Sequence, residues 1–397
     1  MVITFWALLL SSALVGVGAS PVTAPKKPFS LNRRNDGWPY PLDEVDKLEE
    51  EAISKYEAYL AKQNTTRGCT LENSAKRLEW HDMTIAQREE YIRAVLCLQS
   101  KPPKADTASY PGVLSRYDDF VLTHETQAFH LHSTPHLFPG HRLYIWAYEK
   151  ALREECGYTG WQPYWNWGRT AADPVNTPLF NGNMSSMGGQ GAYVDYKGIA
   201  AAAFKPPYDY IPAGGGGGCV TDGPFKNMTV SLGPIGSVLP DGVVPKNPRS
   251  DGFGSNPRCL RRDVNKYASQ VLFANFTGAL IRNSPTIDKF QQDMLGIPEK
   301  NDWGVHMAGH YTIGGDPGGD FFSSPGDPLF WFHHGMVDRI WWIWQMQDPE
   351  NRMNVLPSPP PADDVVDLNW VGVEPSNVWD LNDSIGGYGG KFCYIYV

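Results

Sequence analysis

Two features are scarce in this 397-residue sequence: clusters of basic residues and apolar runs long enough to span a membrane. The 34 Lys and Arg residues are outnumbered by 43 Asp and Glu residues, which gives a formal net charge of -9. Basic residues occur in short pairs such as Arg33–Arg34 and Arg261–Arg262. Such pairs are too small for a duplex-binding surface, so we expect no nucleic-acid partner. No apolar run after residue 20 reaches spanning length, so we expect no membrane partner.

The N-terminus has the pattern of a secretory signal. Residues 2–17 are nearly all apolar or small, and small residues follow around Ala19. We therefore predict a signal peptide over 1–19, an irregular tail or pro-segment over 20–40, and a single domain over 41–397. The protein is expected to be secreted. Five Asn-x-Ser/Thr sequons are candidate glycosylation sites, at Asn64, Asn183, Asn227, Asn275 and Asn382.

Cysteine is sparse as well. The six cysteines include no CxxC pair, which argues against a thiolate metal site. In an exported chain an even number of cysteines favours disulfides, and six allow 15 pairings. Cys219 and Cys259 flank one Gly-rich stretch, and we expect them to form a local pair.

Apolar periodicity predicts a mainly helical fold with long irregular loops and little β-structure. The predicted helices cover 43–62, 84–99, 116–125, 141–155, 284–294, 303–311 and 327–344 or beyond. Pro135 and the Pro139–Gly140 pair are expected to break the chain between the third and fourth helices. The stretch from about 176 to 258 is rich in Gly and Pro, with five consecutive glycines at 214–218. We interpret it as a surface excursion rather than a linker between two domains.

The histidines carry the strongest functional signal. Nine of the ten fall into two short windows, 124–141 and 306–334. The windows hold His124, His130, His132, His136 and His141, and then His306, His310, His333 and His334. His306 and His310 are four residues apart, so on a helix both imidazoles lie on one face and can share a metal ion. In the first window a Pro- and Gly-bearing loop allows His132 to approach His124 and His141.

Two centres of three histidines each follow from this spacing. All-imidazole sites suit Zn, Cu, Fe or Ni. A non-haem iron site usually adds a carboxylate, and neither window has one at matching spacing. Zinc hydrolases need a general base beside the metal. Paired centres without cysteine or carboxylate fit copper best.

Two long segments resemble the copper-binding regions of tyrosinases and catechol oxidases, the polyphenol oxidase family. They are LTHETQAFHLHSTPHLFPGHRLYIWAYEKALREECGYTGWQPYWNW and GVHMAGHYTIGGDPGGDFFSSPGDPLFWFHHGMVDRIWWIWQ. The resemblance runs from about residue 67 to near the C-terminus, and is closest to the short secreted fungal type. It implies a four-helix bundle that carries the ligands. It also implies two copper ions, with O2 as co-substrate and small phenols as substrates. The ligands implied are His124, His132 and His141 for one copper and His306, His310 and His334 for the other.

Two departures from the family pattern bear on activity. Many fungal relatives have a Cys, cross-linked to the second ligand, where this chain has His130. Enzymes that hydroxylate monophenols often have Asn after the first ligand of the second copper, where this chain has Met307. A thioether is a weak acceptor and is poorly suited to hold a water that deprotonates a phenol. We therefore expect oxidation of o-diphenols to o-quinones, with weak or no monophenol hydroxylation.

The remaining expectations concern the surroundings of the site. Met307, Tyr311, Phe321 and Phe322 are expected to line the substrate pocket. Asp338 and Arg116 are expected to support the ligands, although a salt bridge of Asp338 with Arg116 or Arg339 is an equal alternative. His81 is expected to be a surface or capping residue, and His130 and His136 are expected to support the ligands or to pack rather than to bind metal. Spacing alone does not decide between His333 and His334 as the ligand. The Trp residues near the last helix are expected to pack in the core.

Two alternatives stay open. One is a true tyrosinase that oxidises both monophenols and diphenols. The other is a dicopper O2-binding protein without turnover, like the haemocyanins, although those work as large assemblies and a monomer is favoured here. A zinc hydrolase or a metal-free structural domain fits the clustered histidines poorly. The chain closes on KFCYIYV, which resembles the end of the family's catalytic domain, so no latency through an appended shielding domain is expected.

Overall fold

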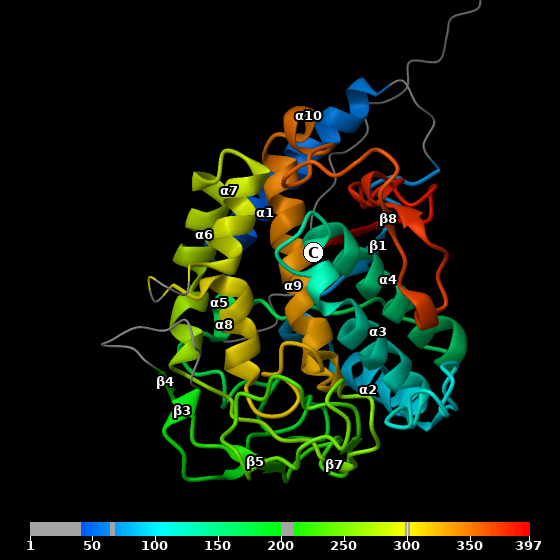
Figure 1. Ribbon diagram of the computed structural model, residues 1–397. Coiled ribbons are helices and arrows are strands. Elements are labelled where there is room, and N and C mark those ends of the chain that lie inside the picture. Colours follow the sequence, from blue (N-terminus) through cyan, green and yellow to red (C-terminus); the bar gives the residue numbers. More distant parts are fainter. Residues whose placement is uncertain (1–40, 64–67, 200–209, 298–299, 301) are drawn as a thin grey trace, which may run out of the picture.

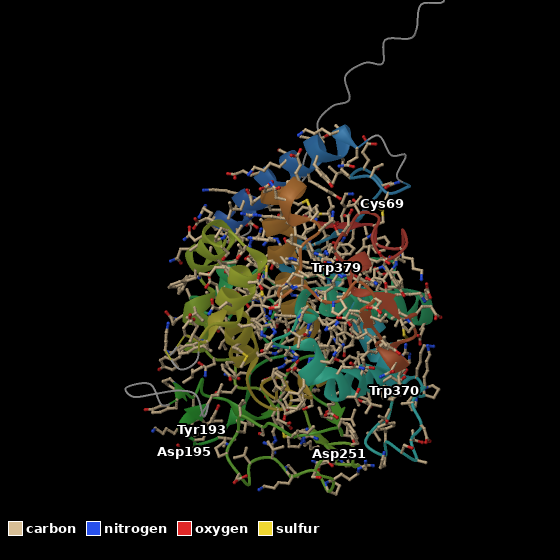
Figure 2. All side chains as sticks on the ribbon, turned by 45° about the horizontal axis from the view of Figure 1, so that its top comes forward. Cys69, Tyr193, Asp195, Asp251, Trp370 and Trp379 are labelled. Atoms are coloured by element: carbon tan, nitrogen blue, oxygen red, sulfur yellow. A yellow bond between two sulfur atoms is a disulfide. The ribbon has the colours of Figure 1, made fainter. Side chains whose placement is uncertain are left out.

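The computed structural model describes residues 41–63, 68–199, 210–297, 300 and 302–397. The predicted signal peptide, the predicted tail over 20–40 and the sequon at Asn64 lie outside the described residues. Within the described part the protein is mainly helical, with short strands joined by long loops, as the sequence predicts (Figure 1). Side chains fill the space between the helices (Figure 2).

Four helices form the centre of the molecule. They are α3 (Arg116–Leu131), α4 (Leu137–Cys156), α8 (Gly304–Ile313) and α9 (Leu329–Gln347). Around them pack α1 (Glu44–Lys62), α2 (Ile85–Ser100), α6 (Ala274–Asn283) and α7 (Ile287–Leu295). Two single-turn helices complete the set, α5 (Trp167–Thr170) and α10 (Pro349–Arg352). Helices α1, α2 and α3 each begin with a capping box. The N-cap side chain, which is Asp43, Thr84 or Ser115, accepts from the N3 backbone amide, and the N3 side chain accepts from the N-cap backbone amide.

Helix α9 lies at the centre of this arrangement. Every residue from Leu329 to Met346 is buried, so the helix has no solvent face. A helix that is apolar on all sides is stable only when other elements surround it. The tryptophans of this region pack in the core as expected, namely Trp331, Trp341, Trp342 and Trp344.

The boundaries of two helices differ from the sequence-based expectation. Helix α3 continues to Leu131, and α4 begins at Leu137, so the predicted break at Pro139–Gly140 is wrong. Pro139 is the third residue of α4, and in the first turn of a helix the backbone amides have no intrahelical acceptor. The proline ring therefore removes no hydrogen bond there. Helix α6 was not predicted.

Within the described residues, the strands are two to four residues long and pair in five two-stranded sheets. Strand β1 (Ala75–Arg77) pairs in parallel with β10 (Tyr394–Tyr396). The antiparallel pairs are β2 (Gly191–Tyr193) with β5 (Gly217–Val220), β3 (Gly198–Ile199) with β4 (Ile211–Pro212), β6 (Thr229–Val230) with β7 (Arg258–Cys259), and β8 (Val365–Val366) with β9 (Ser376–Asn377).

Three disulfides join all six cysteines. They are Cys69–Cys393, Cys97–Cys156 and the expected pair Cys219–Cys259. Among the sequons in the described part, Asn382 is buried whereas Asn183, Asn227 and Asn275 are exposed. None of the described helices combines the length and apolar character that a membrane crossing requires.

The loop-rich stretch lies at one end of the central helices (Figure 1). Two buried ion pairs join the end of this stretch, and a residue just after it, to the loop between α8 and α9. Arg258 Nε lies 2.6 Å from Asp316 Oδ2, and Arg262 Nε lies 2.7 Å from Asp327 Oδ2. This attachment holds the stretch against the end of the bundle where the histidines gather.

Candidate metal centre

The first histidine cluster is built by the α3–α4 hairpin. His124 lies on α3, His132 caps the C-terminus of α3, and His141 lies on α4. The three ring centroids lie 5.0 to 5.9 Å apart. Their nitrogens converge closely enough to bind one metal ion.

Backbone carbonyls fix the orientation of all three rings. The Nδ1 atom of His132 lies 2.7 Å from the Ala128 carbonyl oxygen, and that of His141 lies 2.7 Å from the Leu137 carbonyl oxygen. His124 Nδ1 lies 2.6 Å from the Phe322 carbonyl oxygen. A neutral imidazole that donates from Nδ1 keeps its lone pair on Nε2, and metal-bound histidines are commonly held in this way.

The second cluster combines α8 and α9. His306 and His310 lie one turn apart on α8, and α9 contributes His333 and His334. Nitrogens of all four lie within 4.8 Å of one another. His310 Nε2 and His334 Nε2 are 3.2 Å apart. As predicted, the i, i+4 spacing on a helix brings two imidazoles to one point.

The two clusters face each other. The rings of His141 and His334 stack with centroids 4.3 Å apart and an interplanar angle of 10°. His132 and His306 approach at 5.7 Å between centroids. Two metal ions held in these clusters would therefore share one chamber and could act on one molecule together.

Burial keeps these imidazoles neutral. It lowers the pKa of His132 to about 4 and that of His310 to about 3, and the imidazole of His132 adds to the effect at His310. Burial and neighbouring imidazoles also place the pKa values of His124, His141, His306 and His334 well below the ordinary value. Buried Nε2 atoms of His124, His141 and His306 have no hydrogen-bond partner in the described part. Neutral imidazoles with unused lone pairs are a donor set that suits copper.

His333 lies behind the second cluster. Its ring is fully buried, with its centroid 4.5 Å from that of His310 and 5.2 Å from that of Trp167. It packs directly against Gly309 of α8, where a Cβ would lie 2.1 Å from a His333 ring atom. No pattern in the sequence indicates that Gly309 makes room for this ring.

A cavity of about 160 Å³ opens onto both clusters. Its lining includes the expected residues Met307, Tyr311 and Phe321, together with His132, His306 and His310. Phe322 is not part of the lining, and it acts instead through its carbonyl on His124. The loop-rich stretch supplies the other wall, through Gly236, Ser237 and Val238. This stretch is therefore more than a surface excursion, and no pattern in the sequence indicated its part in the site.

Asp338 and Arg116 do not support the ligands in the way we expected. Asp338 accepts from Arg142 Nε at 2.7 Å, and it also accepts from Arg77, Tyr394 and Tyr396. Arg116 lies elsewhere, where it binds Asp119, Glu155 and two carbonyls. The alternative pairing of Asp338 with Arg116 or Arg339 is also wrong. Because Arg142 follows His141 and Asp338 lies one turn after His334, the ion pair ties the two ligand-bearing helices together.

The remaining histidines have structural contacts. The expected surface or capping place of His81 is wrong, because its side chain is buried in the core with Nδ1 2.8 Å from Glu79 Oε1. His130 stacks on His136 with ring centroids 4.1 Å apart, and His136 Nε2 lies 2.9 Å from Asp364 Oδ2. These contacts join the loop that carries His132 to the C-terminal part of the chain.

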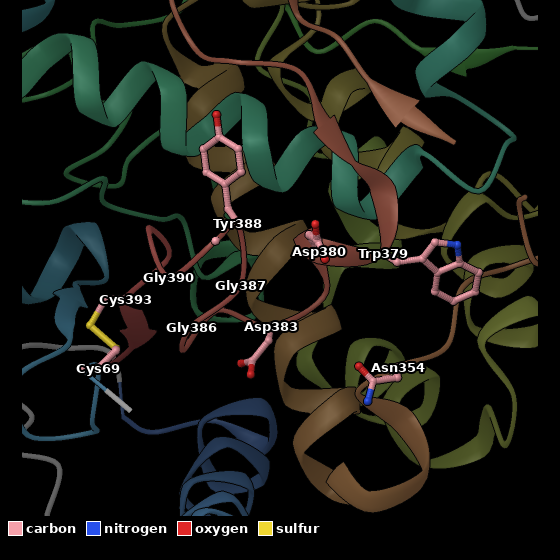
Figure 3. A pocket seen from close by; sticks show the side chains of 12 residues that line it. Cys69, Asn354, Trp379, Asp380, Asp383, Gly386, Gly387, Tyr388, Gly390 and Cys393 are labelled. Atoms are coloured by element: carbon pink, nitrogen blue, oxygen red, sulfur yellow. A yellow bond between two sulfur atoms is a disulfide. The ribbon is translucent and has the colours of Figure 1, made fainter. Parts of the chain in front are cut away.

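A larger cavity of about 740 Å³, shown in Figure 3, has no histidine in its lining. It is lined by the glycine-rich loop at 386–390, the Cys69–Cys393 disulfide and residues such as Trp379 and Asp383. None of its lining residues belongs to the histidine clusters, so the smaller cavity is the candidate active site.

Comparisons with known proteins agree with this geometry. The family model described as the common central domain of tyrosinase matches residues 114–347, more than half of the chain. The chain is 40% identical over 298 residues to the tyrosinase-like protein orsC of Emericella nidulans, covering 72% of this chain and 77% of that protein. It is 36% identical over 357 residues to N-acetyl-6-hydroxytryptophan oxidase ivoB of the same organism, covering 83% and 93%.

Among solved structures, a polyphenol oxidase variant from Thermothelomyces thermophila superposes with a TM-score of 0.79 and 37% identity. The match covers 89% of this chain and 98% of that one. The chain belongs to the tyrosinase family. Its fold is the one that in this family carries a dinuclear copper site, and it is an oxidoreductase of the polyphenol oxidase type.

Proposed function

We propose that this protein is a catechol oxidase, which converts o-diphenols to o-quinones and reduces O2 to water. One copper ion would be held by His124, His132 and His141, and the other by His306, His310 and His334. The observation that carries the proposal is the pair of facing histidine clusters at the base of one cavity lined by Met307.

We assign His334 rather than His333 as the third ligand because the two rings lie on different sides of the second cluster. His334 stacks on His141 of the first cluster, and its Nε2 faces His310 Nε2 at 3.2 Å. His333 lies against Gly309 and Trp167 on the opposite side of the cluster. A dinuclear site needs its third ligand between the two clusters, where His334 lies.

Two bound copper ions would accept electrons from the phenol and pass them to O2. Each catechol gives up two electrons and two protons when it becomes an o-quinone. Two catechols therefore supply the four electrons and four protons that convert one O2 to two molecules of water. The protein has to bind the ring, exclude bulk water and hold the ligands, and the buried clusters beneath a small cavity meet these needs.

The lining of the cavity favours diphenols over monophenols. A monophenol must lose its proton before it binds a metal ion well, which calls for a base or an activated water beside the ring. Among the described lining residues the one carboxylate is Asp320, and both of its oxygens accept from backbone amides. Met307 follows His306 and offers only a weak acceptor. A catechol needs this help less, because its two adjacent oxygens lose protons more readily.

Oxygen uptake by the copper-loaded protein tests the proposal. We expect uptake with 4-methylcatechol and little or none with tyramine or tyrosine. Met307→Asn should raise uptake with tyramine, whereas Met307→Leu, which keeps the shape without the amide, should not. Prompt oxidation of tyramine by the unchanged protein would make it a tyrosinase. Uptake with neither substrate would support O2 binding without turnover.

We also infer that the protein is exported. Three disulfides join residues far apart in the chain, and such bonds form and persist in oxidising compartments. Asn183, Asn227 and Asn275 are accessible to glycosylation, whereas the buried Asn382 is not. Mass measurement of the secreted protein before and after enzymatic deglycosylation checks this inference.

A further inference from the structure

Phe129 is an exposed aromatic side chain beside the candidate active site. It lies in the last turn of α3, three residues before His132, and 76% of its surface is exposed. No other large apolar residue in the described part is more exposed. A single exposed apolar residue is ordinary on a protein surface. Phe129 differs from such residues because its ring contacts Phe321, which lines the cavity.

A row of aromatic rings leads from Phe129 into the cavity. The Phe129 ring centroid lies 5.8 Å from that of Phe321 and 5.3 Å from that of Phe322. Phe321 lines the cavity, and its ring centroid lies 4.8 Å from that of His132. Phe321 is half-buried, so the row runs from the buried histidines to the surface. Aromatic rings at these separations bind a further ring by offset or edge-on packing.

The size of the cavity requires part of the substrate to lie outside it. Its volume of about 160 Å³ is smaller than typical small-molecule sites of roughly 300–1,000 Å³. A catechol ring docked against the histidines leaves little space for a large substituent at carbon 4. Such a substituent must extend past Phe321 toward the surface, where Phe129 lies.

The lining also has no group that would attract a charged substituent. Among the described lining residues there is no Lys or Arg. The carboxylate of Asp320 is engaged by four backbone amides, at Ile235, Gly236, Phe322 and Ser323. A substrate carboxylate would leave water without gaining a cationic partner, which is unfavourable.

We propose that Phe129 and Phe321 form an outer aromatic subsite that binds an uncharged aryl or alkyl substituent at carbon 4 of the catechol. This inference rests on the proposed function, since it assigns the substrate class of the same site. It predicts that catechols with an extended neutral substituent are better substrates than catechol itself or catechols that carry a carboxylate.

The test compares Phe129→Ala with Phe129→Tyr, which keeps the ring. Phe276→Ala is the matched control, because Phe276 is also exposed, at 51%, but lies on α6, which carries no site histidine. For each copper-loaded protein, KM and kcat are measured with catechol and with 4-phenylcatechol. Wild-type kcat/KM is also compared between 3-(3,4-dihydroxyphenyl)propanoate and its methyl ester. Calorimetry gives the Kd of resorcinol and of 4-phenylresorcinol, whose meta hydroxyls cannot form an o-quinone.

We expect Phe129→Ala to raise KM for 4-phenylcatechol and Kd for 4-phenylresorcinol by about 3- to 10-fold, the range of one aromatic contact. Values for catechol and resorcinol should stay within about 2-fold. Phe129→Tyr should restore binding, Phe276→Ala should change nothing, and the wild type should prefer the ester. Equal changes with and without the phenyl group, or no change, would overturn the inference. If no catechol is oxidised, the proposed function fails, and the resorcinol pair still decides whether the subsite exists.

Discussion

The two histidine clusters are held in place in different ways. In the first cluster every Nδ1 atom lies within 2.7 Å of a backbone carbonyl oxygen, so the main chain sets the orientation of each ring. In the second cluster the Nδ1 atoms of His306 and His334 have no hydrogen-bond partner within the described residues. There packing positions the rings of His306 and His334, with His333 as a fourth imidazole against Gly309, whereas His310 has a backbone hydrogen bond at Gly318.

This difference shows two physical routes to the same donor set. A carbonyl that accepts from Nδ1 fixes both the tautomer and the ring direction. A ring positioned by packing depends on the volume of its neighbours, because protein cores have few voids and resist changes of one methyl group. We therefore expect substitutions of small residues to damage the second cluster more than the first.

The largest effect is expected from removing one ligand. His334→Gln should leave the protein with one copper ion in place of two and lower catechol oxidation by more than the roughly 100-fold typical of changes around a metal site. The reason is that two imidazoles alone hold copper weakly and a dinuclear reaction needs both ions. Copper content by atomic absorption and O2 uptake measure the two effects.

His333→Gln is the matched control, since the two residues are adjacent and equally buried. We expect this variant to retain two copper ions, with a reduced affinity at the second cluster because the packing around His310 changes. Loss of a whole copper ion in His333→Gln, with retention in His334→Gln, would reverse our assignment of the ligand.

A smaller effect is expected from breaking the link between the clusters. Asp338→Asn should lower the free energy of unfolding by about 3–5 kcal/mol, because Arg142 is fully buried and loses its charged partner. Since α4 and α9 each carry a ligand, the copper affinity of both clusters should fall together. Thermal unfolding and copper titration measure these changes.

Asp241→Asn serves as the control for Asp338→Asn. Asp241 pairs with Lys246 at 3.2 Å on the surface, where both side chains are exposed. Such pairs contribute little to stability. A fall in stability of similar size in both variants would show that the buried ion pair has no special role in joining the two helices.

Much of the copper site could be predicted from the sequence, since local spacing determines part of the geometry. The i, i+4 spacing of His306 and His310 requires only a helix to bring both rings together. We expected a Pro- and Gly-bearing loop to bring His132 to His124, whereas α3 continues to Leu131 and His132 caps its C-terminus. Helix α4 begins before Pro139 because a proline is tolerated in the first turn of a helix. A rule that treats every proline as the end of a helix does not recognise this exception.

The rest depended on contacts between distant segments. Asp338 binds Arg142 and Arg77, which lie 196 and 261 residues away in the sequence, so no local pattern could select them over Arg339. The wall formed by Gly236–Val238 follows from how the loop-rich stretch folds back onto α8. Backbone carbonyls such as that of Phe322 carry no residue-type signal at all.

The smallest effect, and the most direct test of the comparison, is expected from Gly309→Ala. The added Cβ would lie 2.1 and 2.2 Å from two His333 ring atoms, closer than any real contact allows. Alanine favours a helix over glycine by about 1 kcal/mol, whereas overpacking a core costs about 1–3 kcal/mol. We therefore expect a net loss of up to about 2 kcal/mol in stability. Copper affinity should fall at the second cluster and stay unchanged at the first.

Two further variants decide whether packing is the cause. Gly278→Ala places its Cβ 2.8 Å from the side chain of Glu44, which is partly exposed and can move, so it should be neutral or stabilising. Gly309→Ala combined with His333→Ala removes the ring that the new methyl group meets. It should raise copper affinity at the second cluster from the Gly309→Ala level to that of His333→Ala alone. If the double variant binds copper no better than Gly309→Ala alone, the volume behind His310 does not position that cluster.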